Sequence, residues 1–136
     1  MRVCPSQIIH PDTGQSGILG FMSSIVRYET DYCIEECNAC TNVFPGRALQ
    51  PLNLEQKQAY IIGTAQLDKA LCLHGISDCD ACVNACLFDA IKIYWDKEAN
   101  ESCFVVDSMK CNGCGACEVC CPTGDIKAIK VLKKTD

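Results

Sequence analysis

The most constraining feature of this sequence is a run of cysteines between residues 111 and 122. The run has the pattern C-x2-C-x2-C-x3-C-P, made by Cys111, Cys114, Cys117, Cys121 and Pro122. This spacing is typical of a segment that holds a [4Fe–4S] cluster, in which three close thiolates bind one cluster and the fourth binds its neighbour. Gly113 and Gly115 favour this assignment, because a loop without side chains lets backbone N–H groups approach the cluster.

Cysteine usage across the whole chain points the same way. The chain has 14 cysteines among 136 residues, and such a density indicates either disulfides or metal ligands. Residues 1–5 do not resemble a signal peptide, and no apolar run is long enough to span a membrane. We therefore expect a cytoplasmic protein without a membrane span, whose thiolates bind metal. A zinc ribbon is the alternative, but zinc sites use paired C-x2-C knuckles.

Three further groups of cysteines precede this run. One contains Cys72, Cys79, Cys82 and Cys86, which keep the C-x2-C-x3-C spacing except that Cys72 lies upstream by an x6 gap. Another contains Cys33, Cys37 and Cys40 in a C-x3-C-x2-C pattern, followed by Phe44 where a fourth cysteine is expected. The last is Cys4, which precedes a proline as Cys121 does. Cys4 therefore looks like the tail of a cluster motif.

Internal repeats divide the chain. Residues 1–11 align without gaps with residues 41–51, which places Cys4 opposite Phe44. In the second half, Asp68 and Asp107 each stand four residues before a cysteine, and an Ala-Ile-Lys segment follows each cysteine loop. Each unit predicts a short strand, a cysteine loop, a helical turn and a second short strand.

The segments between the motifs carry weaker signals. Asn53 and Gln56 have the spacing of a capping box, which predicts a helix over residues 54–62 that stops at Gly63. Residues 18–28 are apolar and mixed, and we expect them to form a short helix or a loop that covers a cluster.

With these motifs, residues 64–136 resemble a bacterial-type 2[4Fe–4S] ferredoxin, and residues 1–52 resemble a truncated, degenerate second copy. Residues 53–63 would be the connecting helix. The whole chain is similar to polyferredoxin-like electron-transfer subunits of oxidoreductases, including those that serve molybdenum or tungsten enzymes of anaerobic metabolism. The resemblance implies an α+β fold, with short β-hairpins and short helices around the clusters. The sequence departs from the pattern in its missing first loop, at Phe44, in its x3 and x6 spacings, and at Leu87, where proline often follows Cys86.

The resemblance also implies three ligand sets, because adjacent motifs in such folds exchange their fourth cysteine. Cluster A would take Cys72, Cys79, Cys82 and Cys121. Cluster B would take Cys86, Cys111, Cys114 and Cys117. Cluster C would take Cys4, Cys33, Cys37 and Cys40. The x6 gap makes Cys72 the least regular ligand, and without it cluster A would be a [3Fe–4S] centre, so both forms stay open.

Three positions fall outside these sets. A fourth cluster would need three cysteines upstream of Cys4 and a cysteine at position 44, and the sequence has neither. We expect Phe44 to fill the space of the lost cluster; the alternative is an ordinary core residue. Cys103 and Cys120 are left over, and we expect both to be small buried side chains. Cys120 competes with Cys121 for cluster A.

These features predict an electron-transfer protein rather than an enzyme. We expect it to be the iron–sulfur subunit of a multi-subunit oxidoreductase, with a larger catalytic subunit as its redox partner. A freestanding low-potential ferredoxin carrier is the alternative.

The net charge of −5 argues against nucleic acid as a partner. Two rivals come from other classes. One is a fragment of a radical S-adenosylmethionine activase, because residues 33–40 also fit its C-x3-C-x2-C motif. The other is an iron–sulfur sensor.

Overall fold

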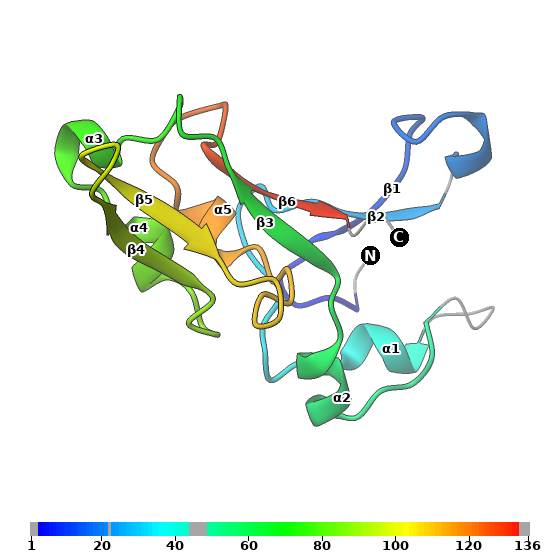
Figure 1. Ribbon diagram of the computed structural model, residues 1–136. Coiled ribbons are helices and arrows are strands. Elements are labelled where there is room, and N and C mark those ends of the chain that lie inside the picture. Colours follow the sequence, from blue (N-terminus) through cyan, green and yellow to red (C-terminus); the bar gives the residue numbers. More distant parts are fainter. Residues whose placement is uncertain (1–2, 22, 44–48, 134–136) are drawn as a thin grey trace.

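A computed structural model describes residues 3–21, 23–43 and 49–133. Within these ranges the chain folds into small two-stranded antiparallel sheets and short helices, so the expected α+β class is confirmed (Figure 1). The strands are β1 (Ile9–Pro11), β2 (Ser24–Val26), β3 (Gly63–Leu67), β4 (Ile91–Asp96), β5 (Glu101–Val106) and β6 (Ile129–Lys133). The helices are the 3-10 turn η1 (Ile18–Gly20), α1 (Ala39–Val43), α2 (Leu54–Ala59), α3 (His74–Ser77), α4 (Ala81–Asn84) and α5 (Ala116–Cys120). Phe44 lies outside the described residues.

The second half follows the repeat seen in the sequence. Each unit runs from a strand through a cysteine loop and a short helix to a second strand, as β3–α4–β4 and as β5–α5–β6. The backbone N–H of Asp68 donates to the carbonyl of Ala128, and that of Asp107 donates to the carbonyl of Ala90, both at 2.7 Å. Each aspartate side chain also accepts the N–H two residues further on, at 2.9 Å. The two units therefore have the same local structure.

The pairing of the strands interleaves these two units. Strand β3 pairs with β6, from Gly63 opposite Lys133 to Leu67 opposite Ile129, while β4 and β5 form a hairpin. The first strand of one unit thus lies beside the last strand of the other (Figure 1). Ala90 and Ile129, each 1% exposed, lie in one buried cluster together with several of the cysteines. The buried cluster has few apolar side chains, and cysteines make up much of the rest.

The connecting helix begins where predicted and ends early. Asn53 and Gln56 form both hydrogen bonds of the capping box, so that prediction is confirmed. The prediction that the helix extends to residue 62 is wrong, because Tyr60 already has an extended backbone. Gly63 opens β3 instead of capping the helix. A Cβ at Gly63 would approach the carbonyl oxygen of Leu132 to 2.5 Å, so glycine is required for the close approach of β6.

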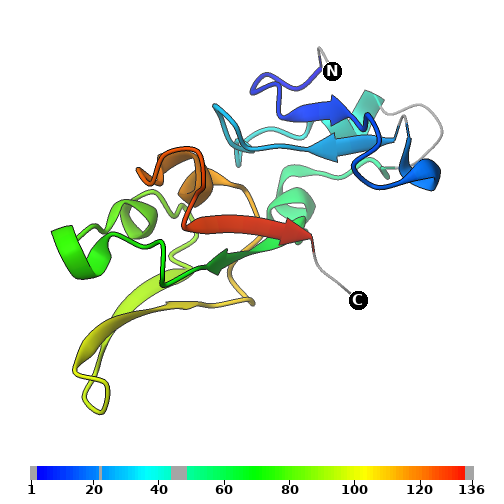
Figure 2. The same cartoon turned by 90° about the horizontal axis from the view of Figure 1, so that it is seen from above.

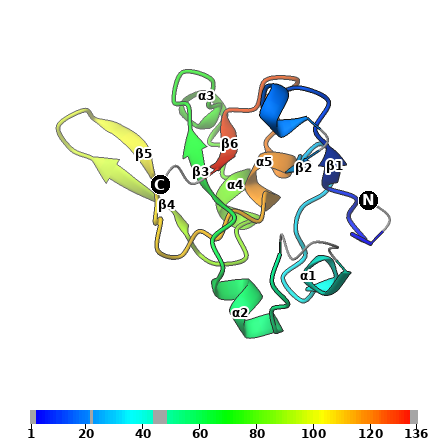
Figure 3. The ribbon, with the colours of Figure 1, turned by 90° about the vertical axis from the view of Figure 1, so that its right-hand side faces the viewer.

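The first half packs on the second through a small apolar contact. Buried Ile8, Ile9 and Tyr28 contact Val119 of α5 and Val131 of β6. Figures 2 and 3 show the β1–β2 sheet on the same side of the molecule as α5 and β6. The two halves therefore form one structure through the face of α5 and β6.

The expectation that residues 18–28 cover a cluster is wrong for their first part. Ile18 and Leu19 in η1 are almost fully exposed, at 96% and 103%. The carboxylate of Asp12 orders the preceding turn by accepting the N–H groups of Gly14, Gln15 and Ser16 at 2.7–3.0 Å. Among residues 18–21 and 23–28, the described part of this segment, Tyr28 is the buried residue.

Candidate metal centres

The twelve cysteines assigned to clusters line three separate cavities, four to each. Cavity A is lined by Cys72, Cys79, Cys82 and Cys121. Cavity B is lined by Cys86, Cys111, Cys114 and Cys117. Cavity C is lined by Cys4, Cys33, Cys37 and Cys40. Cavities A and B have volumes of about 20 Å³ each and cavity C has about 550 Å³. The structure thus brings together each predicted set, and iron ligation by these sets stays a prediction.

The four cysteines of each set lie around a cavity, and their sulfurs do not converge on the position of a single metal ion. Among residues 3–21, 23–43 and 49–133, no three His, Cys, Asp or Glu side chains are placed as the ligands of one metal ion would be. A single zinc ion brings four ligands within about 2.3 Å of one centre. An iron–sulfur cluster needs a different arrangement of ligands, because each thiolate binds a different iron and the four cysteine sulfurs lie around the cluster.

Cavity B is built by the glycine-containing loop that opens α5. Gly113 and Gly115 have φ values of 79° and 87°, in the left-handed region where glycine is favoured. A Cβ at Gly113 would collide with the backbone of Gly63, so the loop can approach β3 closely only without a side chain. The N–H of Ala65 then donates to the sulfur of Cys111 at 3.4 Å. The Ala90 N–H donates to the sulfur of Cys86 at 3.3 Å in the same way.

Burial favours the protonated form of two thiols of cavity B. Burial raises the pKa of Cys114 and raises that of Cys117 well above the usual range, and the neighbouring thiols add to the effect at Cys117. Without a cation these sulfurs remain protonated at neutral pH. A bound metal removes this penalty by supplying positive charge, and a coordinating thiol is then deprotonated.

Cavity A distinguishes between Cys120 and Cys121. Burial acts to raise the pKa of Cys121, but hydrogen bonds from Thr123 and from backbone N–H groups outweigh it and lower the pKa. The sulfur of Cys121 lies 3.2 Å from the Thr123 hydroxyl and lines the cavity. Cys120 instead donates to the carbonyls of Ala81 and Cys117, both at 3.3 Å, and burial raises its pKa. The local chemistry therefore favours Cys121 as the ligand.

The x6 gap between Cys72 and Cys79 contains helix α3. His74 of this helix contacts the carbonyl of Cys79 through Nδ1 at 3.0 Å and the hydroxyl of Ser102 through Nε2 at 2.6 Å. Its ring also packs edge-on against Phe104, with centroids 4.8 Å apart. This histidine has no partner at a ligand spacing, so the sequence predicts a surface residue, whereas its side chain is partly buried. It ties the longer loop to β5, which brings Cys72 and Cys79 to one cavity.

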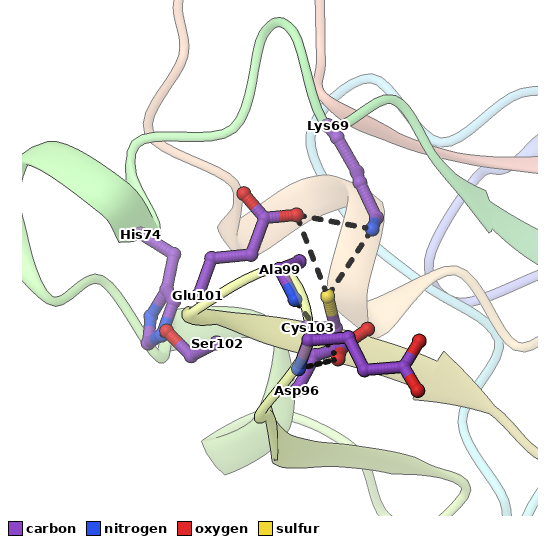
Figure 4. Close-up of polar contacts among 8 residues, drawn as sticks. Lys69, His74, Asp96, Ala99, Glu101, Ser102 and Cys103 are labelled. Atoms are coloured by element: carbon purple, nitrogen blue, oxygen red, sulfur yellow. Dashed lines mark hydrogen bonds and ion pairs between the residues drawn. The ribbon is translucent and has the colours of Figure 1, made fainter.

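Cys103 lines none of these three cavities. It is 3% exposed, as expected of a small buried side chain, and lies on β5. Its sulfur accepts from Lys69 Nζ at 3.2 Å, and Glu101 lies 3.7 Å from the same ammonium (Figure 4). The hydrogen bond that Lys69 donates to Cys103, followed by the electrostatic interaction between the two groups, raises the pKa of Lys69.

Cavity C contacts the loop of cavity B through the backbone. The N–H of Cys33 donates to the carbonyl of Cys114 at 2.8 Å. Beside it, the hydroxyl of Tyr28 donates to the carbonyl of Gly113 at 2.5 Å, and the Tyr28 ring packs where a side chain at Gly115 would stand. Sequence analysis missed Tyr28 because a lone aromatic residue in an irregular segment carries no pattern.

Two polar residues of cavity C were also missed. Lys57 of α2 lines the cavity and is only 6% exposed, although the sequence pattern of a short polar helix predicts an exposed lysine. Ser6 lines the same cavity and is 7% exposed. One signal could have revealed Ser6, because Cys4-Pro5-Ser6 parallels Cys121-Pro122-Thr123.

Comparisons of the whole sequence with known protein families and with curated proteins find no match. Within the described part of the chain, the structure has no helix with the length and apolar character needed to cross a membrane.

Proposed function

We propose that this chain transfers electrons through three [4Fe–4S] clusters, as the iron–sulfur subunit of a multi-subunit oxidoreductase. The observation that carries the proposal is the grouping of twelve cysteines into three cavities of four. The three sets implied by the resemblance to ferredoxins are the same three sets that line the cavities. A chance distribution of 14 cysteines would not be expected to give this agreement.

The residues present fit such clusters chemically. Every cavity offers four thiols. In cavity B the backbone N–H groups of Ala65 and Ala90 donate to sulfur, and in cavity A the hydroxyl of Thr123 is hydrogen-bonded with the sulfur of Cys121. Such donors stabilise thiolates and adjust the potential of an iron–sulfur centre. The clusters would supply one-electron redox chemistry. The paired strand–loop–helix–strand units favour a 2[4Fe–4S] ferredoxin-like arrangement for residues 64–136, with residues 1–52 as an added, incomplete half.

The contacts between the loops favour the order C–B–A for the relay. Cys33 of cavity C is hydrogen-bonded to Cys114 of cavity B through the backbone at 2.8 Å. Cavities B and A are joined through the chain itself, because α5 leads from Cys117 to Cys121 and α4 leads from Cys82 towards Cys86. The first half would therefore exchange electrons with cluster B, and cluster A would lie at the far end.

Two surface features favour a bound subunit over a freestanding carrier. The exposed apolar side chains of Ile18, Leu19 and Phe21 stand together in one ordered loop, where water is an unfavourable environment. Three oxidised clusters would bring the net charge from −5 to about −11, which suits docking on a basic redox partner.

The radical S-adenosylmethionine alternative is less favoured by the geometry. That chemistry needs an iron without a protein ligand in the cluster held by Cys33, Cys37 and Cys40. Cys4 lines the same cavity and is available as the fourth thiolate.

The test is the content of iron and acid-labile sulfide in anaerobically prepared full-length protein. We expect about twelve irons per wild-type chain and about eight in Cys4→Ala, since each cluster holds four. Cys103→Ala is the matched control, because Cys103 lines none of the three cavities, and it should keep about twelve. About eight irons in all three proteins would limit electron transfer to residues 64–136. Zinc in place of iron would refute the proposal.

A further inference from the structure

The wall of cavity C contains a buried positive charge. The ammonium of Lys57 donates to the carbonyls of Ile34 and Glu35, and the side chain is 6% exposed. The ion pairs formed by the described residues, Arg27–Glu29 and Lys69–Glu101, do not include Lys57. A buried ammonium is costly unless an anionic group compensates it, and carbonyl oxygens supply only partial charges.

The thiols of cavity C are the candidates for that compensation within the same cavity. Lys57 and Cys33 both line cavity C, and the two carbonyls that accept from the ammonium belong to the two residues directly after Cys33. The buried ammonium therefore lies in the same part of the cavity wall as Cys33. Four thiolates around an oxidised [4Fe–4S] cluster carry a net charge of about −2, which would supply the missing counter-charge.

Ser6 provides a second, independent sign of a missing hydrogen-bond partner in cavity C. Its hydroxyl is the one buried side-chain oxygen or nitrogen without a hydrogen-bond partner among residues 3–21, 23–43 and 49–133. It lines cavity C and stands two residues after Cys4. In the parallel Cys121-Pro122-Thr123 segment, the hydroxyl at that position lies 3.2 Å from the cysteine sulfur. A serine hydroxyl rotates freely, so Ser6 can donate to an acceptor in the cavity.

In the part of the chain that the structure describes, the other two cavities have no lysine buried in the wall as Lys57 is. Beside cavity A, Lys127 donates to the carbonyl of Cys121 at 2.6 Å, but its side chain is only partly buried and does not line the cavity. No Lys or Arg side chain is among the described residues that line cavity A or cavity B. Thr123 gives cavity A a hydroxyl comparable to that of Ser6, so the buried ammonium is the feature that distinguishes cavity C.

We infer that Lys57, assisted by Ser6, makes cluster C the centre with the highest reduction potential, so that electrons collect at this end of the relay. This inference rests on the proposed function. Reduction adds one negative charge, and a buried cation and a hydroxyl donor stabilise that charge more than they stabilise the oxidised form. An electron that passes from cluster B to cluster C oxidises B by one electron and reduces C by one, with no bond made or broken. Lys57 and Ser6 are positioning residues, since neither is a ligand.

The test is a redox titration of anaerobic full-length protein, with each cluster followed by electron paramagnetic resonance. The signal of cluster C is identified as the one altered by Cys4→Ser. We expect cluster C to be reduced first in the wild type. In Lys57→Met, which keeps the length and loses the charge, the ratio of reduced to oxidised cluster C at a fixed potential should fall about tenfold. That change equals about 59 mV for one electron.

Two variants at Ser6 test the same effect if Lys57→Met does not fold. Ser6→Ala should lower the same ratio about threefold, while Ser6→Thr retains the hydroxyl and should leave it unchanged. Lys92→Met is the matched control, because Lys92 is exposed on β4. Cluster C reduced last, or unaffected by both Lys57→Met and Ser6→Ala, would overturn the inference while about twelve irons per chain still supported the proposed function. About eight irons in the wild type would instead refute three clusters, and the inference with them.

Discussion

Removal of one hydroxyl group at the junction of the two halves tests the packing of this fold. Tyr28 is 9% exposed, and its hydroxyl donates to the carbonyl of Gly113 at 2.5 Å. Tyr28→Phe keeps the ring against Gly115 and leaves that buried carbonyl without this donor. Loss of such a partner costs about 1–3 kcal/mol. We therefore expect the variant to unfold between about 5 and 150 times faster, if the contact is broken in the transition state.

The effect of Tyr28→Phe should depend on pH in a defined direction. Burial, with added effects from nearby thiols, raises the pKa of Tyr28 far above its ordinary value of about 10. A folded-state pKa above the unfolded-state value means that the stability contribution is complete below about pH 10 and is lost as pH rises further. The loss is about 1.4 kcal/mol per pH unit. Phenylalanine does not ionise, so the difference in stability between the wild type and Tyr28→Phe should become smaller above about pH 10.

The assay is the rate of unfolding in guanidinium chloride, followed by circular dichroism under anaerobic, reducing conditions. Tyr94→Phe is the matched control, because Tyr94 is 47% exposed, and it should unfold at the wild-type rate. Two results would refute the reasoning. One is equal unfolding rates for Tyr28→Phe and the wild type at pH 8. The other is a difference between them that stays constant from pH 8 to pH 11.

Three further perturbations have expected outcomes. Gly115→Ala should destabilise the chain by about 2 kcal/mol or more in thermal unfolding, because φ is 87° and the new Cβ would overlap the ring of Tyr28. Cys121→Ala should lower the iron content by up to about four atoms per chain, while Cys120→Ala should leave it unchanged, and equal losses would contradict the assignment of cavity A. Asn53→Ala removes the capping box of α2 and should cost about 1 kcal/mol in denaturant unfolding, with no change in iron content.

Local structure was predictable wherever one short motif is sufficient to specify it. The capping box at Asn53 and the repeated aspartate turns depend on side chains that bond backbone groups two or three residues away. The strand positions of the second half follow from repeated sequence segments for the same reason. The end of α2 was mispredicted because the chain leaves the helix at Tyr60 and the N–H of Ile62 bonds the distant carbonyl of Asn112.

The sequence by itself determined the spacing of the cysteine motifs and the two repeated units. The division of the cysteines into three sets and the α+β class followed from the resemblance to ferredoxins, and the structure brings the four cysteines of each set to one cavity. Only the tertiary structure decided that Cys33 meets Cys114, that Tyr28 fills the junction, and that Lys57 and Ser6 turn inwards to cavity C. These features depend on contacts between segments far apart in the chain, such as Tyr28 with Gly113, and no local spacing or periodicity encodes such contacts.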